Sequence, residues 1–256
     1  MKVAILADIH GNGMALENVL EDAESIGVEE YWFLGDYAAI GYDPVGVLER
    51  ITDLPAARFI HGNTDRYLVT GELPWLQLEE AIRDLAHART YVQVARSFAW
   101  TTGAVGATGW LSWFKDLPLD FRFILPDGTR VLAVHAAPGT DDGAGININT
   151  ADEDLYALVE KTDADLILVG HTHLPFDRRA GTIRVVNPGS VSNPFPPDLR
   201  ASYAVLEADG QQYTIHHRRV DYDRDAVVQA VREVNHPALD YVERFMKGEN
   251  KKPWMK

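Results

Sequence analysis

Seven side chains of metal-binding type stand at the ends of short apolar runs in this 256-residue chain: Asp8, His10, Asp36, Asn63, His135, His171 and His173. Imidazole, carboxylate and amide ligands suit transition metals such as Mn, Fe, Ni or Zn better than Ca or Mg alone. Thiolate ligands are excluded because the chain has no cysteine. Each residue taken singly is more often structural, but seven together exceed the needs of one tetrahedral ion. Two divalent ions sharing a bridging carboxylate would use them all.

The apolar runs that precede these residues predict strands over Lys2–Ala7, Tyr31–Leu34, Arg58–Ile60, Arg130–Val134 and Asp165–Val169. Sites in open α/β sheets form beyond the carboxyl ends of the strands, so we expect one sheet to bring the side chains together. Asp8/His10 and His171/His173 are spaced by two residues, which places each pair on one face of extended backbone. Glycine before Asp36 and His171 allows a sharp exit from the strand.

Helical patterns alternate with the first strands. Apolar spacing predicts a helix over Met14–Ile26, and Asp43-Pro44 opens a short one to Arg50. This βαβαβ order favours a mainly parallel sheet covered by helices. Further along, we expect strands, a capped helix and a helical C-terminal region: Leu119–Leu125, a capping box at Thr150–Glu153 for a helix to Lys161, strands Ile183–Val186, Tyr203–Leu206 and Tyr213–His217 joined by tight turns into an antiparallel portion, and helices over 223–246 interrupted near His236.

Residues 66–117 interrupt the strand rhythm. Leu78, Ile82, Leu85 and Val92 predict one long helix, and Trp110–Phe114 predict a shorter one. Four of the six tryptophans fall here, and two interpretations stay open: an aromatic core, or a cap that presents aromatic side chains to a substrate or partner. We predict one domain over residues 1–256 with a helical cap inserted at about 66–117.

Composition excludes several classes of protein. The formal net charge is −14, and only Arg218-Arg219 and Lys251-Lys252 form basic pairs, so duplex nucleic acid is an unlikely ligand. No run approaches the roughly 20 apolar residues of a membrane span, and the N-terminus lacks a signal-peptide pattern. We therefore expect a cytoplasmic protein that binds no membrane. The sequence leaves the oligomeric state open.

The motifs resemble those of the calcineurin-like metallophosphoesterase superfamily, in particular its small bacterial and archaeal phosphodiesterase-like members. The family pattern is Asp-x-His, Gly-Asp, Gly-Asn followed by His, Asp or Glu, a lone His, and Gly-His-x-His. This chain has Asp8-Ile-His10, Gly35-Asp36, Gly62-Asn63-Thr64-Asp65, His135 and Gly170-His171-Thr172-His173. Asn187-Pro-Gly-Ser190 resembles a turn that follows the site in small bacterial members.

The resemblance implies an α/β (α+β) fold, a four-layer β-sandwich of two sheets flanked by helices. One ion would be held by Asp8, His10, Asp36 and His173, and the other by Asp36, Asn63, His135 and His171, with Asp36 as the bridge. The two ions would activate a water as hydroxide for in-line attack on the phosphorus of a mono- or diester. Asn12, Asn63 and Arg66 would contact the substrate.

One position departs from the family pattern. Many members carry a histidine where this chain has Thr64, which cannot act as a general acid near neutral pH. His61, Asp65 and Arg66 are the nearby candidates for assisting the leaving group, beside Asn63 and His135 at the phosphate. The leading hypothesis is hydrolysis of small phosphorylated or nucleotide substrates. A protein phosphatase, a dinucleoside polyphosphate hydrolase, a nuclease of short strands and a non-catalytic scaffold remain alternatives, although a scaffold would be expected to lose ligands and all seven are present.

Overall fold

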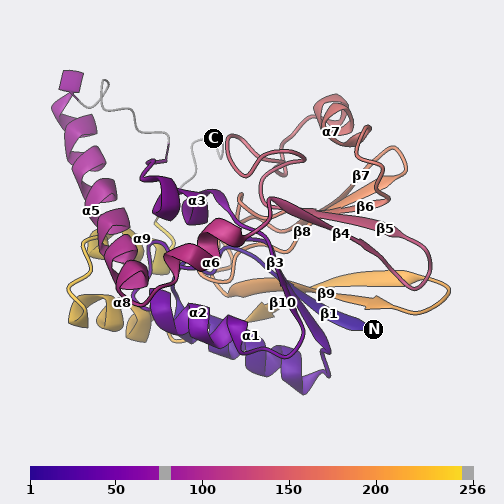
Figure 1. Ribbon diagram of the computed structural model, residues 1–256, viewed down its shortest axis with the longest axis horizontal. Coiled ribbons are helices and arrows are strands. Elements are labelled where there is room, and N and C mark those ends of the chain that lie inside the picture. Colours follow the sequence, from indigo (N-terminus) through magenta and orange to yellow (C-terminus); the bar gives the residue numbers. More distant parts are fainter. Residues whose placement is uncertain (75–81, 250–256) are drawn as a thin grey trace.

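Two five-stranded mixed sheets form the centre of the computed structural model, which describes residues 1–74 and 82–249 (Figure 1). The first sheet has the order β10-β9-β1-β2-β3, with bounds Tyr213–Val220, Ala201–Ala208, Lys2–Leu6, Glu30–Phe33 and Ala57–Phe59. The second has the order β4-β5-β6-β8-β7, with bounds Asp120–Ile124, Arg130–Val134, Leu166–Leu168, Ile183–Asn187 and Phe176–Ala180. In each sheet the three strands β1, β2, β3 or β5, β6, β8 are parallel, so their carboxyl ends share one edge.

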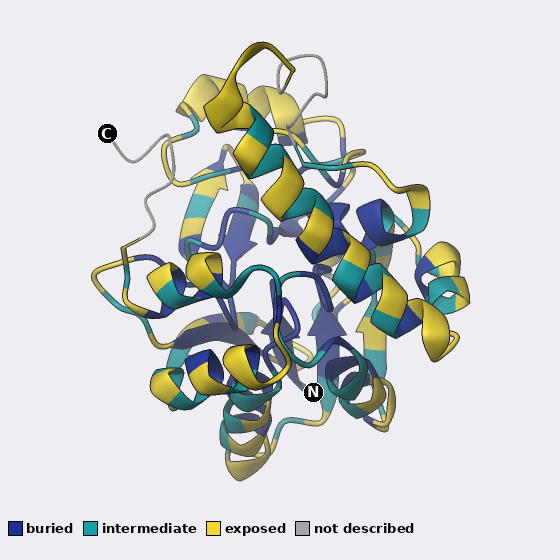
Figure 2. Ribbon diagram, turned by 90° about the vertical axis from the view of Figure 1, so that its left-hand side faces the viewer, coloured by how far each residue is buried: buried dark blue, intermediate teal, exposed yellow. Residues whose placement is uncertain are grey.

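Helices cover the outer faces of both sheets. The helices of the described residues are α1 (Gly13–Ser25), α2 (Pro44–Thr52), α3 (Asn63–Thr70), α5 (Leu85–Ala107), α6 (Leu111–Asp116), α7 (Asp152–Val159), α8 (Arg224–Glu233) and α9 (Leu239–Met246). Helices α1 and α2 lie along the first sheet and α7 lies on the second, while α5, α8 and α9 gather at one end of the molecule (Figure 1). The helices on the side seen in Figure 2 are striped, with one edge exposed and the opposite edge buried.

Alternation along the strands builds three apolar layers. Val3 and Ile5 of β1 point between the sheets, where Trp32 is fully buried against the edges of Phe121 and Phe123. The alternate residues of β1, Ala4 and Leu6, face the helices of the first sheet, in the same layer as Leu16 and Leu20 of α1. Leu132 of β5 faces α7 in the third layer. The expected four-layer sandwich is confirmed, because strands buried on both faces need a partner on each side.

One strand was missed and two local predictions were wrong. β7 was not predicted, because it is a polar edge strand with only its end residues buried. Ile183–Val186 does not join the antiparallel portion by a tight turn, since β8 pairs with β6 and β7 in the second sheet while β9 and β10 form a hairpin in the first. The capping box at Thr150 does not form, because its Oγ1 accepts from the N–H of Asn147 at 2.9 Å and α7 begins two residues later.

The segment that separates the strands of the two sheets, residues 66–117, is helical in its described part, as expected. The prediction of one long helix through Ile82 and Leu85 was wrong, because Asp84 has extended backbone and caps α5, which begins at Leu85. Leu78 of the predicted helix lies outside the described residues. Trp113 of α6 packs edge-on against Tyr37 and Phe59 of the first-sheet core, with ring centroids 5.5 and 5.4 Å apart, which favours the aromatic-core interpretation for this residue. Whether α5 and α6 act as a cap over the site stays a prediction.

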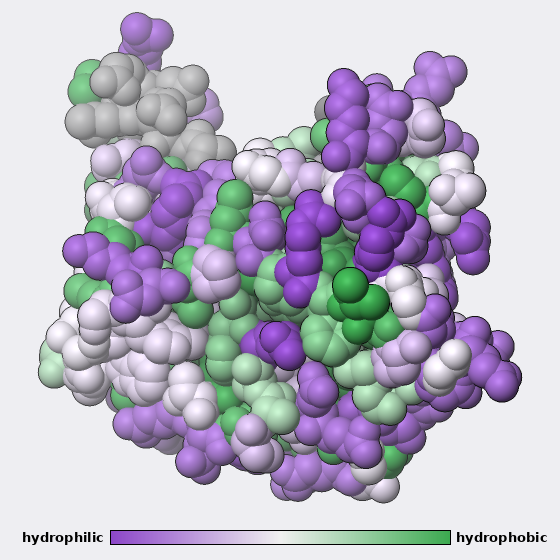
Figure 3. Space-filling view, turned by 45° about the vertical axis from the view of Figure 1, so that its right-hand side comes forward, coloured by the Kyte–Doolittle hydropathy of each residue, from purple (hydrophilic) through white to green (hydrophobic). Residues whose placement is uncertain are grey.

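Polar side chains surround the face drawn in Figure 3, and apolar ones gather towards its middle. Among the described residues, no helix combines the length and apolar character needed to cross a membrane.

Candidate metal centre

The seven candidate ligands come from the carboxyl-end loops of both sheets. Asp8 and His10 follow β1, Asp36 follows β2, and Asn63 begins α3 after β3. The remaining three come from the second sheet: His135 after β5, and His171 and His173 after β6. The expectation that a single sheet assembles them was therefore wrong, because the site lies where the edges of two stacked sheets meet.

The side chains of the two sheets approach one another closely. Nε2 of His10 lies 3.2 Å from Nε2 of His173. Oδ1 of Asn63 lies 3.1 Å from Nε2 of His135 and 3.0 Å from Nδ1 of His171. Oδ2 of Asp36 lies 3.5 Å from Nε2 of His135 and 3.8 Å from Nε2 of His10, so this carboxylate stands between the two groups.

Asp8 completes the cluster, and both carboxylates are almost fully buried. Oδ1 of Asp8 lies 3.5 Å from Nε2 of His173, and Asp8 and Asp36 are 0% and 2% exposed. Potential ligand atoms fall within 4.8 Å of one another in two overlapping sets, Asp8/His10/His173 and Asp8/Asp36/His135. Both carboxylates thus have positions from which they could join two ions, and the choice of Asp36 as the bridge stays a prediction.

The backbone at the ligands is left-handed. Asp8, His10, Asp36, His171 and His173 have φ between 49° and 64°, and they make up five of the eight non-glycine residues with positive φ in the described part of the chain. Each such residue costs on the order of 1–3 kcal/mol, and this strain concentrates at functional sites. Extended backbone at the two spaced pairs, as expected from the sequence, was wrong: β1 and β6 end before the ligands.

Backbone carbonyls fix the orientation of all four imidazoles. Nδ1 of His10, His135 and His173 lies 3.2, 2.6 and 3.1 Å from the carbonyl oxygens of Ala39, Leu34 and Asn193. His171 is turned the other way, with Nε2 lying 3.0 Å from the carbonyl oxygen of Gly143. A carbonyl can only accept, so each of these nitrogens carries the proton. The opposite nitrogen of each neutral ring then directs a lone pair into the cluster, as metal-binding histidines do.

This donor set fits divalent cations. With their outer nitrogens protonated, His10 and His173 direct two lone pairs at one another across 3.2 Å. His135 and His171 direct theirs at the amide oxygen of Asn63, which also accepts. Lone pairs that converge in this way need a proton or a cation between them. Two buried carboxylates add the negative charge that a cation would neutralise.

The pKa values of the candidate ligands show the same demand for positive charge. Burial lowers the pKa of His135, but the carboxylates of Asp36 and Asp8 outweigh burial and raise the pKa to about 10. Burial raises the pKa of Asp36, but neighbouring imidazoles, His135 foremost, hold it well below the usual range of a carboxyl group. His135 therefore holds a second proton readily, and a metal ion bound at this position would have to displace it.

Asp65 is a buried clamp between two ligand-bearing turns. Its Oδ2 accepts hydrogen bonds from the backbone N–H of Asp36 at 2.7 Å and of Gly62 at 2.8 Å, and its Oδ1 accepts from Tyr37 N–H at 3.0 Å. Burial and repulsion by Asp36 raise the pKa of Asp65 to about 7, while the three N–H donors favour the ionised form. Asp65 is fully buried, so its contacts are those of a positioning residue.

Asn187 ties the second sheet to the site and was identified from the sequence only as part of a familiar turn. Its Nδ2 donates to the carbonyl of Gly170 at 2.7 Å and to Oγ1 of Thr172 at 3.1 Å, which are the neighbours of His171. Three residues later, Ser190 Oγ donates to the carbonyl of Asp8 at 2.9 Å. The turn therefore holds ligands from both sheets in register.

Charged residues form a rim beside the ligands. Nδ1 of His61 lies 3.1 Å from Oδ2 of Asp141, and this carboxylate raises the pKa of the imidazole. Arg66 donates to Asp141 through Nε at 2.8 Å and to Asp142 at 3.0 Å, and it also pairs with Glu72. The two basic residues predicted near the substrate are thus brought together, but carboxylates already engage Arg66.

Asn12 and Thr64 lie in the same region. Oδ1 of Asn12 caps α1 by accepting from Ala15 N–H at 3.1 Å, and Nδ2 donates to Ser192 at 3.3 Å. Thr64 donates its backbone N–H to Oδ1 of Asp36 at 3.0 Å. A contact of Asn12 with substrate stays a prediction, and Thr64 serves Asp36 through its backbone.

Comparison with known proteins agrees with this architecture. Residues 1–211 match the calcineurin-like phosphoesterase superfamily domain, and the chain belongs to this superfamily.

Most of the chain can be aligned with two relatives. The chain is 28% identical over 236 residues to "Uncharacterized protein MJ0912" of Methanocaldococcus jannaschii, and the match covers 86% of this chain and 88% of that protein. A metallophosphoesterase from Sphaerobacter thermophilus is 27% identical with a TM-score of 0.73, covering 98% and 99% of the two chains. The hypothetical protein PH1004 from Pyrococcus horikoshii OT3 shares the fold, with 21% identity, a TM-score of 0.80 and the same coverage.

Proposed function

We propose that this protein hydrolyses phosphate mono- or diesters of small molecules or nucleotides with two divalent transition-metal ions. The observation that supports this most directly is the convergence of four carbonyl-oriented imidazoles on two buried carboxylates and the amide of Asn63. Two ions held there would activate a water for attack and neutralise the charge of the phosphoryl group. Mn, Fe, Ni and Zn all fit this donor set.

The residues divide the work between holding and orienting. Asp8, His10 and His173 form one binding set, and Asn63, His135 and His171 form the other, with Asp36 between them. The amide of Asn63 would also orient the phosphate. Left-handed backbone and the Asp65 clamp hold these groups in place before substrate arrives, which is the preorganisation that catalysis requires.

A residue of the charged rim would protonate the leaving group. Thr64 cannot supply a proton, whereas His61 beside Asp141 has a raised pKa and stands two residues before Asn63. We assign His61 as the donor, with Asp141 as its orienting partner. His61→Gln should then slow esters of alkyl alcohols far more than esters of p-nitrophenol, because a good leaving group departs without a proton. Equal slowing of both ester classes would contradict this role.

The hydrolysis itself is tested with Asp36→Ala and His135→Ala. Protein reconstituted separately with Mn, Fe, Ni and Zn is assayed against a monoester, a diester and a nucleotide, and bound metal is counted by mass spectrometry. Each variant should lose metal and fall by at least about 10³-fold in kcat/KM. His87→Ala, an exposed histidine on α5, is the matched control and should keep both. Full activity in Asp36→Ala would refute the two-metal assignment, and inactive wild-type protein with every metal would favour the scaffold alternative.

A further inference from the structure

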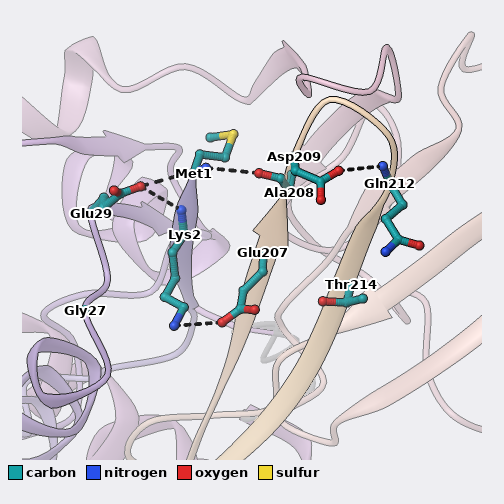
Figure 4. Close-up of a pocket in the computed structure, with 9 residues that line it drawn as sticks. All are labelled: Met1, Lys2, Gly27, Glu29, Glu207, Ala208, Asp209, Gln212 and Thr214. Carbon is teal, nitrogen blue, oxygen red and sulfur yellow. Dashed lines mark hydrogen bonds and ion pairs between the residues drawn. The ribbon is translucent and has the colours of Figure 1, made fainter.

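Two of the cavities that the described residues form lie outside the candidate ligand cluster. One, of about 530 Å³, is at the far end of β1, where strands of the first sheet begin (Figure 4). Its polar groups satisfy one another: Lys2 Nζ pairs with Glu207 at 2.8 Å, and the terminal amine donates to the Ala208 carbonyl at 3.0 Å. Glu29 accepts from the Lys2 backbone at 3.0 Å and Asp209 from that of Gln212. The charged groups that line this groove are therefore already engaged with one another or with the backbone.

The second cavity, of about 410 Å³, lies between α5 and α9 at the helical end of the molecule seen in Figure 1. Phe98 of α5 and Tyr241 of α9 give it an aromatic ring from each helix, and Ile40 closes it on the side of the first sheet. Polar side chains also line it, namely Thr90, Gln93, Ser97, Asp240 and Arg244. The described part of the chain shows no hydrogen-bond partner for the side chains of Gln93 and Asp240. Its size and mixture of apolar and polar groups are those of small-molecule sites.

Contacts between side chains connect the lining of this cavity to the candidate metal centre along three routes, and the longest route passes through Phe245 and Phe195. Ile40 directly follows Ala39, whose carbonyl orients His10. The ring of Phe98 lies 5.9 Å from that of Tyr67, which follows the candidate ligand Asn63 by about one turn of α3. On the third side, Tyr241 contacts Phe245, which contacts Phe195, which stacks at 6.1 Å on His173.

We propose that this cavity, the α5/α9 pocket, binds the nucleobase of a nucleotide substrate whose phosphate lies at the metal centre. The inference rests on the proposed hydrolysis and narrows its substrate to nucleoside phosphates. Aromatic and apolar walls accommodate a planar base by stacking. The amide of Gln93 offers a donor and an acceptor side by side, which is the pairing that reads the edge of adenine.

The test uses two diesters with the same leaving group, the p-nitrophenyl ester of AMP and methyl p-nitrophenyl phosphate. Thr90 lines the pocket from α5, so Thr90→Trp fills it. Its neighbour Arg89 is exposed and does not line the pocket, so Arg89→Trp is the matched control. We expect wild type to prefer the AMP ester, and the ratio of kcat/KM values to fall about tenfold in Thr90→Trp and to stay at the wild-type value in Arg89→Trp.

Gln93→Ala, at an exposed position, gives a second variant should Thr90→Trp fail to fold, and it should lower the same ratio. An unchanged ratio in folded pocket variants would overturn the proposal. If wild type hydrolyses neither ester, the hydrolytic function fails separately. The pocket is then judged by saturation-transfer NMR with AMP and metal-free protein: transfer to the adenine protons that Thr90→Trp abolishes supports the pocket, and transfer that persists in this variant overturns it.

Discussion

Gly62 sits against the carboxylate of Asp36, and Gly62→Ala tests how tightly the centre depends on that contact. The backbone of Gly62 is extended, with φ −96° and ψ 179°, so alanine can adopt it without strain. A methyl group there would lie 2.1 Å from Oδ1 of Asp36 and 2.7 Å from its backbone nitrogen. Real contacts of this kind are longer than 3.0 Å, so the carboxylate must move by about 1 Å.

The magnitude follows from that displacement. Forcing one extra methyl into a packed site costs about 1–3 kcal/mol, and alanine in place of glycine at the start of α3 adds up to about 1 kcal/mol. The displaced Oδ1 weakens its bond from Thr64 N–H, now 3.0 Å long, and Oδ2 leaves its place 3.5 Å from His135. A misplacement of 1 Å can cost about 10²-fold in rate. We therefore expect kcat/KM to fall about 100-fold and metal affinity to fall with it.

Urea denaturation, metal titration and steady-state kinetics measure the three effects on one preparation. Gly103→Ala is the control, because a methyl group at this helical position of α5 meets no atom within 4 Å and should be neutral or slightly stabilising. In an Asp36→Asn background, Gly62→Ala should change metal affinity little further, since the group it displaces is already impaired. Wild-type metal content and activity in Gly62→Ala would refute the reasoning that this contact positions Asp36.

Two further predictions concern buried groups that support the centre. Asp65→Asn leaves at least one of the three backbone N–H groups without an acceptor and all three without a charged one. It should lower the free energy of unfolding by about 2–3 kcal/mol and loosen metal binding, and a variant as stable as wild type in urea would contradict the clamp. His236 is 3% exposed between α8 and α9 and packs against Trp100, and burial lowers its pKa to about 4. Because the unfolded chain binds this proton more readily, stability should fall as the pH drops from about 6.5 to 4, by at most about 3 kcal/mol, and His236→Gln should flatten that part of the pH profile of urea midpoints.

The strands that carry the ligands were predictable because they are locally encoded. Arg130–Val134 is β5 with the same bounds, and Asp165–Val169 contains β6, since short apolar runs buried on both faces are distinctive. The polar edge strand Phe176–Ala180 was missed, because its pairing comes from β8 and not from its own composition. Thr150 resembled a helix cap, but a competing turn with Asn147 uses its hydroxyl.

The types and order of the candidate ligands are properties of the sequence alone. It placed four histidines, two aspartates and one asparagine after apolar runs, and that pattern indicated both the chemistry and the superfamily. The tertiary structure decided how they meet: on two sheets instead of one, and from left-handed backbone instead of extended strands. It also revealed the carbonyls that orient each imidazole, the clamp of Asp65 and the α5/α9 pocket. These features depend on contacts between segments far apart in the chain, and such contacts leave no local periodicity for a sequence to show.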